Sequence, residues 1–246
     1  MRRLIILFLL VASGISAQDG DSLLQAMDET LFPRNYRMTF AVETTESNGR
    51  QRNMELSVNY LHGIGSYMEM LAPARSRGTR FLQRDDALWM FIPRSGARSA
   101  IRLSGRDSFQ GSVFSNRDMG ESSYTQDYHA QIIRRENFVH DEMGEVPAIV
   151  LEAVPAHEEA AYGRLLIWLT EDEHIPLRLE YFVRSGMKVK VMDLFNIQNI
   201  AGRRRPLRME MRSLEEEGKV SVVRISELEA VNDFPARIFT QQYLTR

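Results

Sequence analysis

Few residues of this chain have the types and spacings that catalysis or metal binding requires. The sequence contains no cysteine, and its 5 histidines are scattered along the chain. They are His62, His129, His140, His157 and His174. None forms an H-E-x-x-H motif or an i, i+4 pair, so a metal site would have to be assembled by tertiary contacts alone. We interpret the histidines as surface residues and expect neither a metal site nor a cofactor.

One tetrapeptide matches a catalytic signature. Gly20-Asp21-Ser22-Leu23 spells the nucleophile block of an esterase family, in which the serine follows a buried strand and has a distant Asp-x-x-His partner. No histidine follows His174 in this chain. Asp21 or Ser22 is better placed to cap the start of a helix. We therefore predict that the protein is not an enzyme and has no catalytic residue.

The first 17 residues are organised like a secretory signal peptide. Arg2 and Arg3 precede an apolar run from Leu4 to Ala12, and small residues end the segment at Ser16-Ala17. The apolar run is too short to span a bilayer comfortably, so we expect cleavage after Ala17, with a retained membrane anchor as the alternative. Without cysteine, no lipid can be attached there and no disulfide can form. The prediction is a soluble exported chain, residues 18–246, that folds as a single domain.

The spacing of apolar residues predicts one helix followed by a long series of strands. Leu23, Leu24, Met27 and Leu31 recur at helical spacing from Asp21 onward, and Pro33 ends the pattern. Beyond Arg34 the period changes to two, which predicts a hairpin from residue 36 to residue 60 with one apolar and one wet face. Further strands are expected around 68–70, on both sides of the turn at Asp85-Asp86, where the second strand is 88–92, and after the basic loop that follows it. The series continues at 128–138, 146–154, 165–169, 177–183, 189–195, 207–211 and 220–225.

Two of these strands are apolar at consecutive positions. Leu88 to Ile92 and Leu165 to Leu169 each contain five apolar residues in a row, so both faces of each strand must meet apolar groups. Pro93 ends the first run because it lacks the N–H that a ladder bond needs. Helical turns are expected after Ser115, from Ala156 to Ala161 and after Pro235.

Short turns between consecutive strands predict a mainly β (α+β) fold built on one antiparallel sheet of about eleven strands. A sheet this long curls instead of lying flat, and its apolar concave face must be filled by helices or by a ligand. The formal net charge of −2 gives no basic surface for nucleic acid, so no nucleic acid partner is expected.

The order of residues from Gly78 to Met119 resembles the signature of the LolA-like outer-membrane lipoprotein-sorting proteins. The resemblance consists of a W-x-[YF]-x-P strand, a basic turn, and an S-F-x-G-S-x-F segment followed by an acidic residue. The matching positions are Trp89, Phe91, Pro93, Arg94, Ser108, Phe109, Gly111, Ser112, Phe114 and Asp118. The resemblance implies an incomplete barrel with a helical lid over an apolar cavity. It also implies that the protein receives cargo from an inner-membrane transporter and passes it to an outer-membrane acceptor.

Methionine is frequent on the predicted apolar faces, and its flexible thioether suits a surface that accepts acyl chains of variable shape. Ordinary core filling is the alternative for any single methionine. From the alternation of the strands we expect six residues to line a cavity for acyl chains: Met38, Phe40, Met68, Met70, Trp89 and Phe91.

Arginines form two concentrated positive groups. Arg203-Arg204-Arg205 is one, and Arg75, Arg77, Arg80 and Arg84 make up the other. They could contact anionic lipid headgroups or a membrane partner, or they could simply be solvated charges on a hairpin and an edge strand.

The leading hypothesis is a periplasmic carrier that holds acyl chains of lipoproteins or phospholipids in an open barrel, without catalysis. One alternative is an envelope stress sensor that binds a protein partner through the same fold, as a known sigma-factor regulator does. Another is an outer-membrane β-barrel, whose strands also alternate. The helical C-terminal segment and the amphipathic helix after the signal argue against that second alternative.

Overall fold

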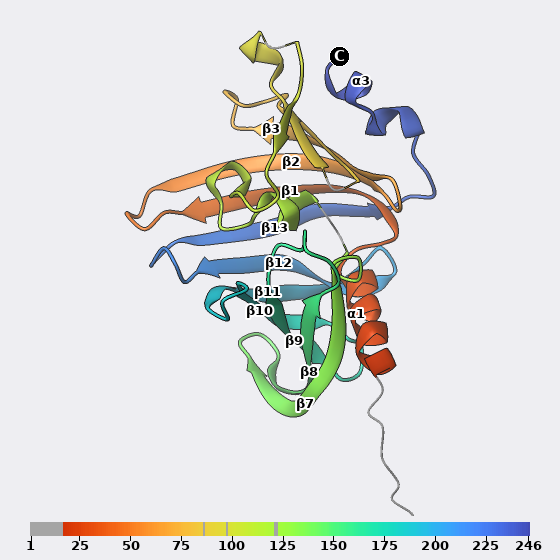
Figure 1. The fold of residues 1–246 in the computed structure, drawn as a ribbon, viewed down its shortest axis with the longest axis vertical. Helices are drawn as coiled ribbons and strands as arrows, with labels where there is room; N and C mark the ends of the chain where they lie inside the picture. The colour runs from red at the N-terminus through yellow and green to blue at the C-terminus, as the bar shows by residue number, and fades with distance from the viewer. Residues whose placement is uncertain (1–16, 86, 97, 121–122) are drawn as a thin grey trace, which may run out of the picture.

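The computed structural model of this chain describes residues 17–246 except residues 86, 97 and 121–122. The predicted signal peptide lies, apart from Ala17, outside the described residues. Strands dominate the described part (Figure 1). They are β1 (Asn35–Thr45), β2 (Gln51–Leu61), β3 (Gly65–Ala72), β4 (Arg80–Arg84), β5 (Ala87–Phe91), β6 (Ile101–Leu103), β7 (Tyr128–His140), β8 (Gly144–Pro155), β9 (Arg164–Thr170), β10 (Pro176–Phe182), β11 (Lys188–Ile200), β12 (Arg203–Ser213) and β13 (Val220–Ala230).

All of these strands belong to one antiparallel sheet, in the order β6-β5-β4-β3-β2-β1-β13-β12-β11-β10-β9-β8-β7. Because β6 and β7 are the two edges and do not pair with each other, the sheet curls without closing into a barrel. The predicted fold class is confirmed, but the sheet has 13 strands instead of about eleven. Short segments such as the 3 residues of β6 pair as full members of the ladder.

Few helices accompany the sheet. The α-helices are α1 (Ala17–Leu31), α2 (Asn116–Gly120) and α3 (Gln241–Leu244), and the 3-10 helices are η1 (Pro93–Ser95), η2 (Phe109–Gly111) and η3 (Ala236–Phe239). The helical end of the chain after Pro235 is therefore confirmed. The helical turn expected from Ala156 to Ala161 is wrong, because these residues form bends and a turn.

The main core lies on the concave face of the sheet. Strand alternation brings apolar residues into rows across this face: Met38 on β1 stands opposite Val58 on β2 and Leu228 on β13. Helix α1 crosses the same face at one end, where it runs beside β7 in Figure 1. Its Leu24 and Met27 are fully buried in this core.

The two fully apolar strands meet apolar groups on both faces, as predicted. On β5, Leu88 belongs to the main core, while Phe91 belongs to a second cluster on the outer face. On β9, Ile167 faces the main core and Trp168 a third cluster beneath β7 to β10. The second cluster is covered by the C-terminal segment with η3 and α3, which lies beside β3 in Figure 1.

Helix α1 is fixed against β7 by residues of the tetrapeptide that resembles an esterase block. A Cβ atom on Gly20 would lie 2.1 Å from the carbonyl oxygen of Ala130, so only glycine allows this close approach. The backbone N–H of Ala130 donates a 2.7 Å hydrogen bond to Asp21 Oδ1. Asp21 therefore lies inside the helix and joins it to a strand, and the expected role of Asp21 or Ser22 as a helix cap is wrong.

Candidate functional site

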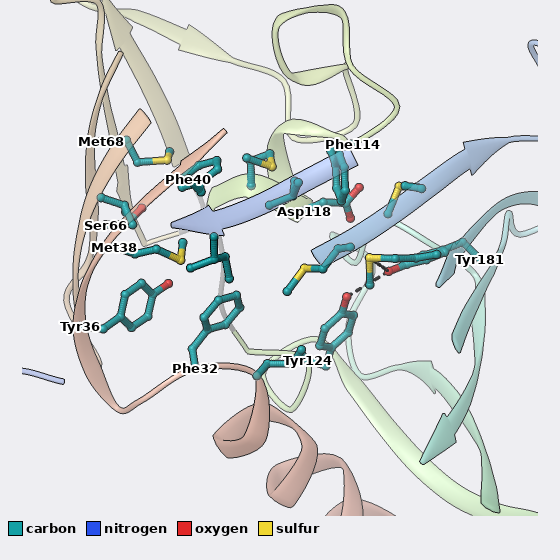
Figure 2. A pocket seen from close by; sticks show the side chains of 18 residues that line it. Phe32, Tyr36, Met38, Phe40, Ser66, Met68, Phe114, Asp118, Tyr124 and Tyr181 are labelled. Atoms are coloured by element: carbon teal, nitrogen blue, oxygen red, sulfur yellow. Dashed lines mark hydrogen bonds between the residues drawn. The ribbon is translucent and has the colours of Figure 1, made fainter. Parts of the chain in front are cut away.

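An apolar cavity lies at the centre of the concave face, between the sheet, the end of α1 and the segment around α2 (Figure 2). Its 18 lining residues come from nine strands or helices and three connecting segments: Leu31, Phe32, Tyr36, Met38, Phe40, Val58, Ser66, Met68, Phe114, Asp118, Met119, Tyr124, Tyr181, Met192, Met209, Met211, Val223 and Ile225. The cavity has a volume of about 80 Å³. That is room for about five to eight waters, which is less than an acyl chain of roughly 16 carbons occupies.

Methionine is the most frequent residue type in the lining. Six of the lining residues are methionines, contributed by β1, β3, α2, β11 and β12. Methionine is unbranched and has three rotatable bonds, so these side chains can repack around a guest more easily than branched residues. A cavity that is small when empty can therefore widen by side-chain rotation before any strand has to move.

One end of the cavity carries hydroxyl groups. Tyr124 and Tyr181 point their hydroxyls toward each other with 3.0 Å between the oxygens, as the dashed line in Figure 2 shows. Beyond them, Tyr162 donates a 2.9 Å hydrogen bond to Asp118 Oδ2, and Lys190 Nζ donates one of 3.0 Å to the Tyr162 hydroxyl. Each of these polar groups has a partner inside the protein, as buried polar groups require.

Burial keeps the phenols at this end neutral. Desolvation raises the pKa of four tyrosines, and the nearby Asp118 carboxylate raises the same pKa values further. We call these residues the tyrosine cluster: Tyr124, Tyr128, Tyr162 and Tyr181. At physiological pH they donate and accept hydrogen bonds without carrying charge. Asp118 and Lys190 form an ion pair next to them, with 3.7 Å between Oδ2 and Nζ.

The S-F-x-G-S-x-F motif builds a compact plug, residues 108–119, that closes one side of the cavity. Phe109 is fully buried and packs against Phe81, with 5.1 Å between ring centroids. Gly111 has a φ of +81°, and a Cβ atom there would collide with the guanidinium of Arg52, which donates to the Gly111 carbonyl. The buried Phe114 lines the cavity directly. The conformation of the motif therefore depends on its glycine and aromatic residues.

The remaining polar residues of the motif tie the plug together. Ser115 and Asp118 exchange hydrogen bonds as a capping box at the start of α2: the Asp118 N–H donates to Ser115 Oγ, and the Ser115 N–H donates to Asp118 Oδ2. This confirms the expected helix start. Ser108 donates to the carbonyl of Ser112, whose own hydroxyl donates to the carbonyl of Phe114.

A second contact joins the end of α1 to the segment that carries Tyr124. The carboxylate of Asp28 accepts four hydrogen bonds of 2.9–3.0 Å, from the N–H groups of Tyr124 and Thr125 and the hydroxyls of Ser123 and Thr125. Only 9% of Asp28 is exposed, and desolvation raises its pKa while the four donors oppose that shift. We call this contact the Asp28 latch. Phe32 and Tyr124, which it positions, both line the cavity on the side nearest α1, and we call this side the rim (Figure 2).

The structure brings together three of the six residues expected to line the cavity. Met38, Phe40 and Met68 are in the lining. Met70 is buried in the main core but is not among the lining residues. Trp89 and Phe91 are on the outer face of β5, against the C-terminal segment.

The prediction that Trp89 and Phe91 of β5 face the cavity is therefore wrong. Every position of this strand is apolar, so alternation could not decide which residues turn inward. Pro93 begins η1, and Arg94 Nη1 donates to the carbonyl of Ala74, so this half of the motif organises the outer side of the sheet.

The surface location expected of the histidines and of the arginine groups is wrong for His140 and Arg205, which are buried. His140 is 3% exposed, and its Nε2 lies 2.8 Å from the carbonyl oxygen of Leu194. Arg80 and Arg84 donate to carbonyls of the C-terminal segment, and β4 is not an edge strand. Arg205 is 4% exposed and binds carbonyls at the end of α1.

Most of the residues that line the cavity could not be predicted from the sequence. The hydroxyl-bearing Tyr124 and Tyr181 come from a connecting segment and from β10, and only tertiary folding brings them together. The alternation of apolar residues on β12 did indicate that Met209 and Met211 face inward.

Within the described part of the chain, no three histidine, aspartate or glutamate side chains are grouped closely enough to hold a metal ion. No helix in that part is long and apolar enough to cross a membrane.

Comparisons with known proteins point to one fold family. Residues 65–246 match a family model described only as "Uncharacterized protein". A search of the curated proteins gives no match. A LolA superfamily protein from Nitrosomonas europaea has a similar structure, with a TM-score of 0.81, 29% sequence identity, and coverage of 94% of this chain and 100% of that chain.

Two further solved structures have the same fold at lower identity. One is a putative outer membrane lipoprotein-sorting protein domain from Vibrio parahaemolyticus, with a TM-score of 0.78, 20% identity, and coverage of 94% of this chain and 100% of that one. The other is a DUF1329 family protein from Desulfovibrio piger, with a TM-score of 0.78, 21% identity, and coverage of 93% and 98%.

Proposed function

This chain belongs to the family whose model matches residues 65–246 and has the LolA-like fold, and from that premise we propose that it is a periplasmic carrier of acyl chains. Residues 18–246 act as one open-barrel domain that holds the chains of a lipid or lipoprotein in the apolar cavity. The protein serves the sorting of lipoproteins or lipids to the outer membrane. It is a binding protein, not an enzyme, and needs no cofactor.

The observation that carries this proposal is the composition of the cavity wall. Apart from Ser66, Asp118 and the tyrosine hydroxyls, the side chains of the lining are wholly apolar or thioethers. An acyl chain offers only apolar surface, so such a wall can bind it without leaving polar groups unpaired. The six methionines allow the wall to adapt to chains of different length and saturation.

Binding would be driven by the removal of apolar surface from water. Each buried methylene contributes about 0.8 kcal/mol. Two methylenes fewer should therefore raise Kd about 15-fold, until the chain no longer fills the cavity. Isothermal titration of the detergent-free protein with fatty acids of increasing length checks this slope. Kd values that do not change with chain length would contradict burial in the cavity.

Access to the cavity requires movement, because the empty space is smaller than an acyl chain. The rim between Phe32 and Tyr124 is the place where two separate segments meet, and the Asp28 latch holds them together. We assign loading and release to opening at this rim. An inner-membrane transporter would deliver the cargo and an outer-membrane acceptor would receive it.

The experiment that tests the proposal is native mass spectrometry of the protein purified from periplasm without detergent, followed by organic extraction. Co-purified phospholipid or acylated peptide supports the carrier and identifies its cargo class. A clean apo mass from a folded protein favours instead the regulator that binds a protein partner.

A pair of variants separates cavity binding from adventitious lipid. Met209→Trp places a larger side chain in the cavity, whereas Met187→Trp makes the same exchange at a site that is 55% exposed. We expect the first variant to lose bound acyl chains and the second to retain them. Thermal unfolding of both variants checks that the overpacked core, which costs about 1–3 kcal/mol, still folds. Equal lipid content in the two variants would exclude this cavity as the binding site.

A further inference from the structure

An outer groove lies next to the apolar cavity, on the far side of the rim. It is lined by Gln25, Asp28, Glu29, Phe32, Pro33, Arg34, Tyr60, His62, Ser123, Thr125, Ala201, Gly202, Arg203 and Arg205. Its volume of about 540 Å³ is several times that of the cavity. Polar side chains dominate this groove, in contrast to the methionine-rich cavity.

Cavity and groove share a thin partition. Phe32 lines both of them, and the segment with Ser123, Tyr124 and Thr125 alternates between the two: Tyr124 faces the cavity, while its two neighbours face the groove. Opening between Phe32 and Tyr124 would therefore join the apolar space to the polar one. A ligand that spans both must have an apolar part attached directly to a polar part.

The charges in the groove favour an anion. Its two carboxylates already have partners, because Asp28 accepts the four hydrogen bonds of the latch and Glu29 lies 3.5 Å from Arg203. Arg34 is exposed, and its side chain has no ion pair or hydrogen bond among the described residues. Arg203 is half-exposed, and its contact with Glu29 is long enough to exchange for a better anion.

Arg205 contributes charge to the groove without being a free donor. Its guanidinium is buried behind the turn between β11 and β12 and is bound to carbonyls of α1. Burial and the neighbouring Arg203 lower the pKa of Arg205 to about 10, so the group is still charged at neutral pH. A fixed positive charge thus lies behind two arginines that can move toward a ligand.

We propose that this groove binds the phosphate headgroup of an anionic phospholipid whose acyl chain occupies the neighbouring cavity. The proposal rests on the carrier function above and narrows its cargo to a lipid with an anionic phosphodiester. Arg34 and Arg203 pair with the phosphate oxygens, while the chain passes between Phe32 and Tyr124. A planar guanidinium matches a phosphate with two parallel hydrogen bonds.

The test compares ligands that have the same short acyl chains and different headgroups. Phosphatidylglycerol, diacylglycerol and glycerophosphate without chains are titrated into the detergent-free protein at low and high salt. We expect phosphatidylglycerol to bind about tenfold more tightly than diacylglycerol, a difference of about 1.4 kcal/mol that shrinks at high salt. Arg34→Ala and Arg203→Ala should each remove most of this preference and leave diacylglycerol binding unchanged.

Arg204→Ala is the matched control, because Arg204 neighbours Arg203, pairs with Glu173 and does not line the groove. Equal binding of the two lipids, or the same loss of preference in the Arg204 control, overturns the headgroup site while the carrier function stands. Glycerophosphate binding as tightly as the whole lipid would show a site for free phosphate esters and would also overturn the proposal. If neither lipid binds, the carrier function fails together with this inference.

Discussion

Replacing Arg205 by leucine should destabilise the fold strongly, whereas the same change at Arg204 should have almost no effect. Arg205 Nη1 donates hydrogen bonds of 2.5 Å and 2.8 Å to the carbonyls of Glu29 and Thr30, and its Nε donates one of 3.3 Å to the carbonyl of Ile200. The carbonyls of Glu29 and Thr30 belong to the last turn of α1, which has no basic residue of its own. Arg205 thus supplies the cation and the donors that a helix C-terminus needs.

The size of the effect follows from these contacts. Hydrogen bonds to a charged group contribute about 1.5–3 kcal/mol each, but removing a buried guanidinium also removes its desolvation cost. We expect a net loss of about 2–3 kcal/mol in the free energy of unfolding. For a chain of this length, that corresponds to a fall in Tm of about 5–10 °C. The Arg204 ion pair with Glu173 is 46% and 42% exposed, so its loss should cost less than about 0.5 kcal/mol.

Urea unfolding and calorimetry of the two variants measure this difference. Hydrogen exchange of the last turn of α1 provides a second measurement, because amides there should exchange faster in Arg205→Leu only. Equal shifts in the two variants would refute the argument, since they would mean that burial and helix capping do not distinguish the neighbouring arginines. A stable Arg205→Leu protein with unchanged exchange in α1 would refute it as well.

Three further predictions concern the helix, the latch and the tyrosines. Gly20→Ala should destabilise the protein, because the new Cβ would collide with the carbonyl of Ala130. This collision should outweigh the preference for alanine over glycine inside helices, which is about 1 kcal/mol. Thermal unfolding measures the change. Asp28→Ala should accelerate release of a bound acyl probe by about tenfold in stopped-flow experiments, since the partition loses its four hydrogen bonds. Glu29→Ala, which removes only exposed contacts with Arg203 and Gln25, should not. Burial raises the pKa of Tyr67 to about 12 and also raises the pKa values of the tyrosine cluster, so at least five of the 8 tyrosines should ionise late in an ultraviolet titration. Unfolded tyrosine releases its proton near pH 10, so the contribution of these tyrosines to the free energy of unfolding should be constant below that pH and fall as the pH rises further; a normal titration of all phenols would contradict this.

The fold was largely predictable because most strands have one apolar and one wet face. The period of two between residues 36 and 60 fixes both the hairpin and the face that turns inward, and β1 and β2 follow it. The same reasoning fails on β5, where Trp89 and Phe91 could face either way. Only the C-terminal segment, distant in sequence, decides that these rings belong to the outer face.

The cavity was predictable in character but not in detail. A long curled sheet with few helices must leave part of its concave face to be filled, and methionines on that face could be expected from the alternation of β1, β3 and β12. The latch and the tyrosine hydroxyls could not be expected. Asp28 contacts residues almost one hundred positions away, and no periodicity in the sequence relates them.

The run of arginines from 203 to 205 shows how strand geometry divides three identical residues. Successive side chains on a strand point to opposite faces, so Arg203 and Arg205 share the side of α1 and the groove, while Arg204 turns away toward Glu173. Arg203 lies nearer the exposed turn and can exchange its partner, whereas Arg205 is two residue pairs further along the ladder and is held by backbone carbonyls. Because of this alternation, Arg203 can bind a ligand and Arg205 stabilises α1. Arg204 points to the other face, so its substitution is a control for both roles.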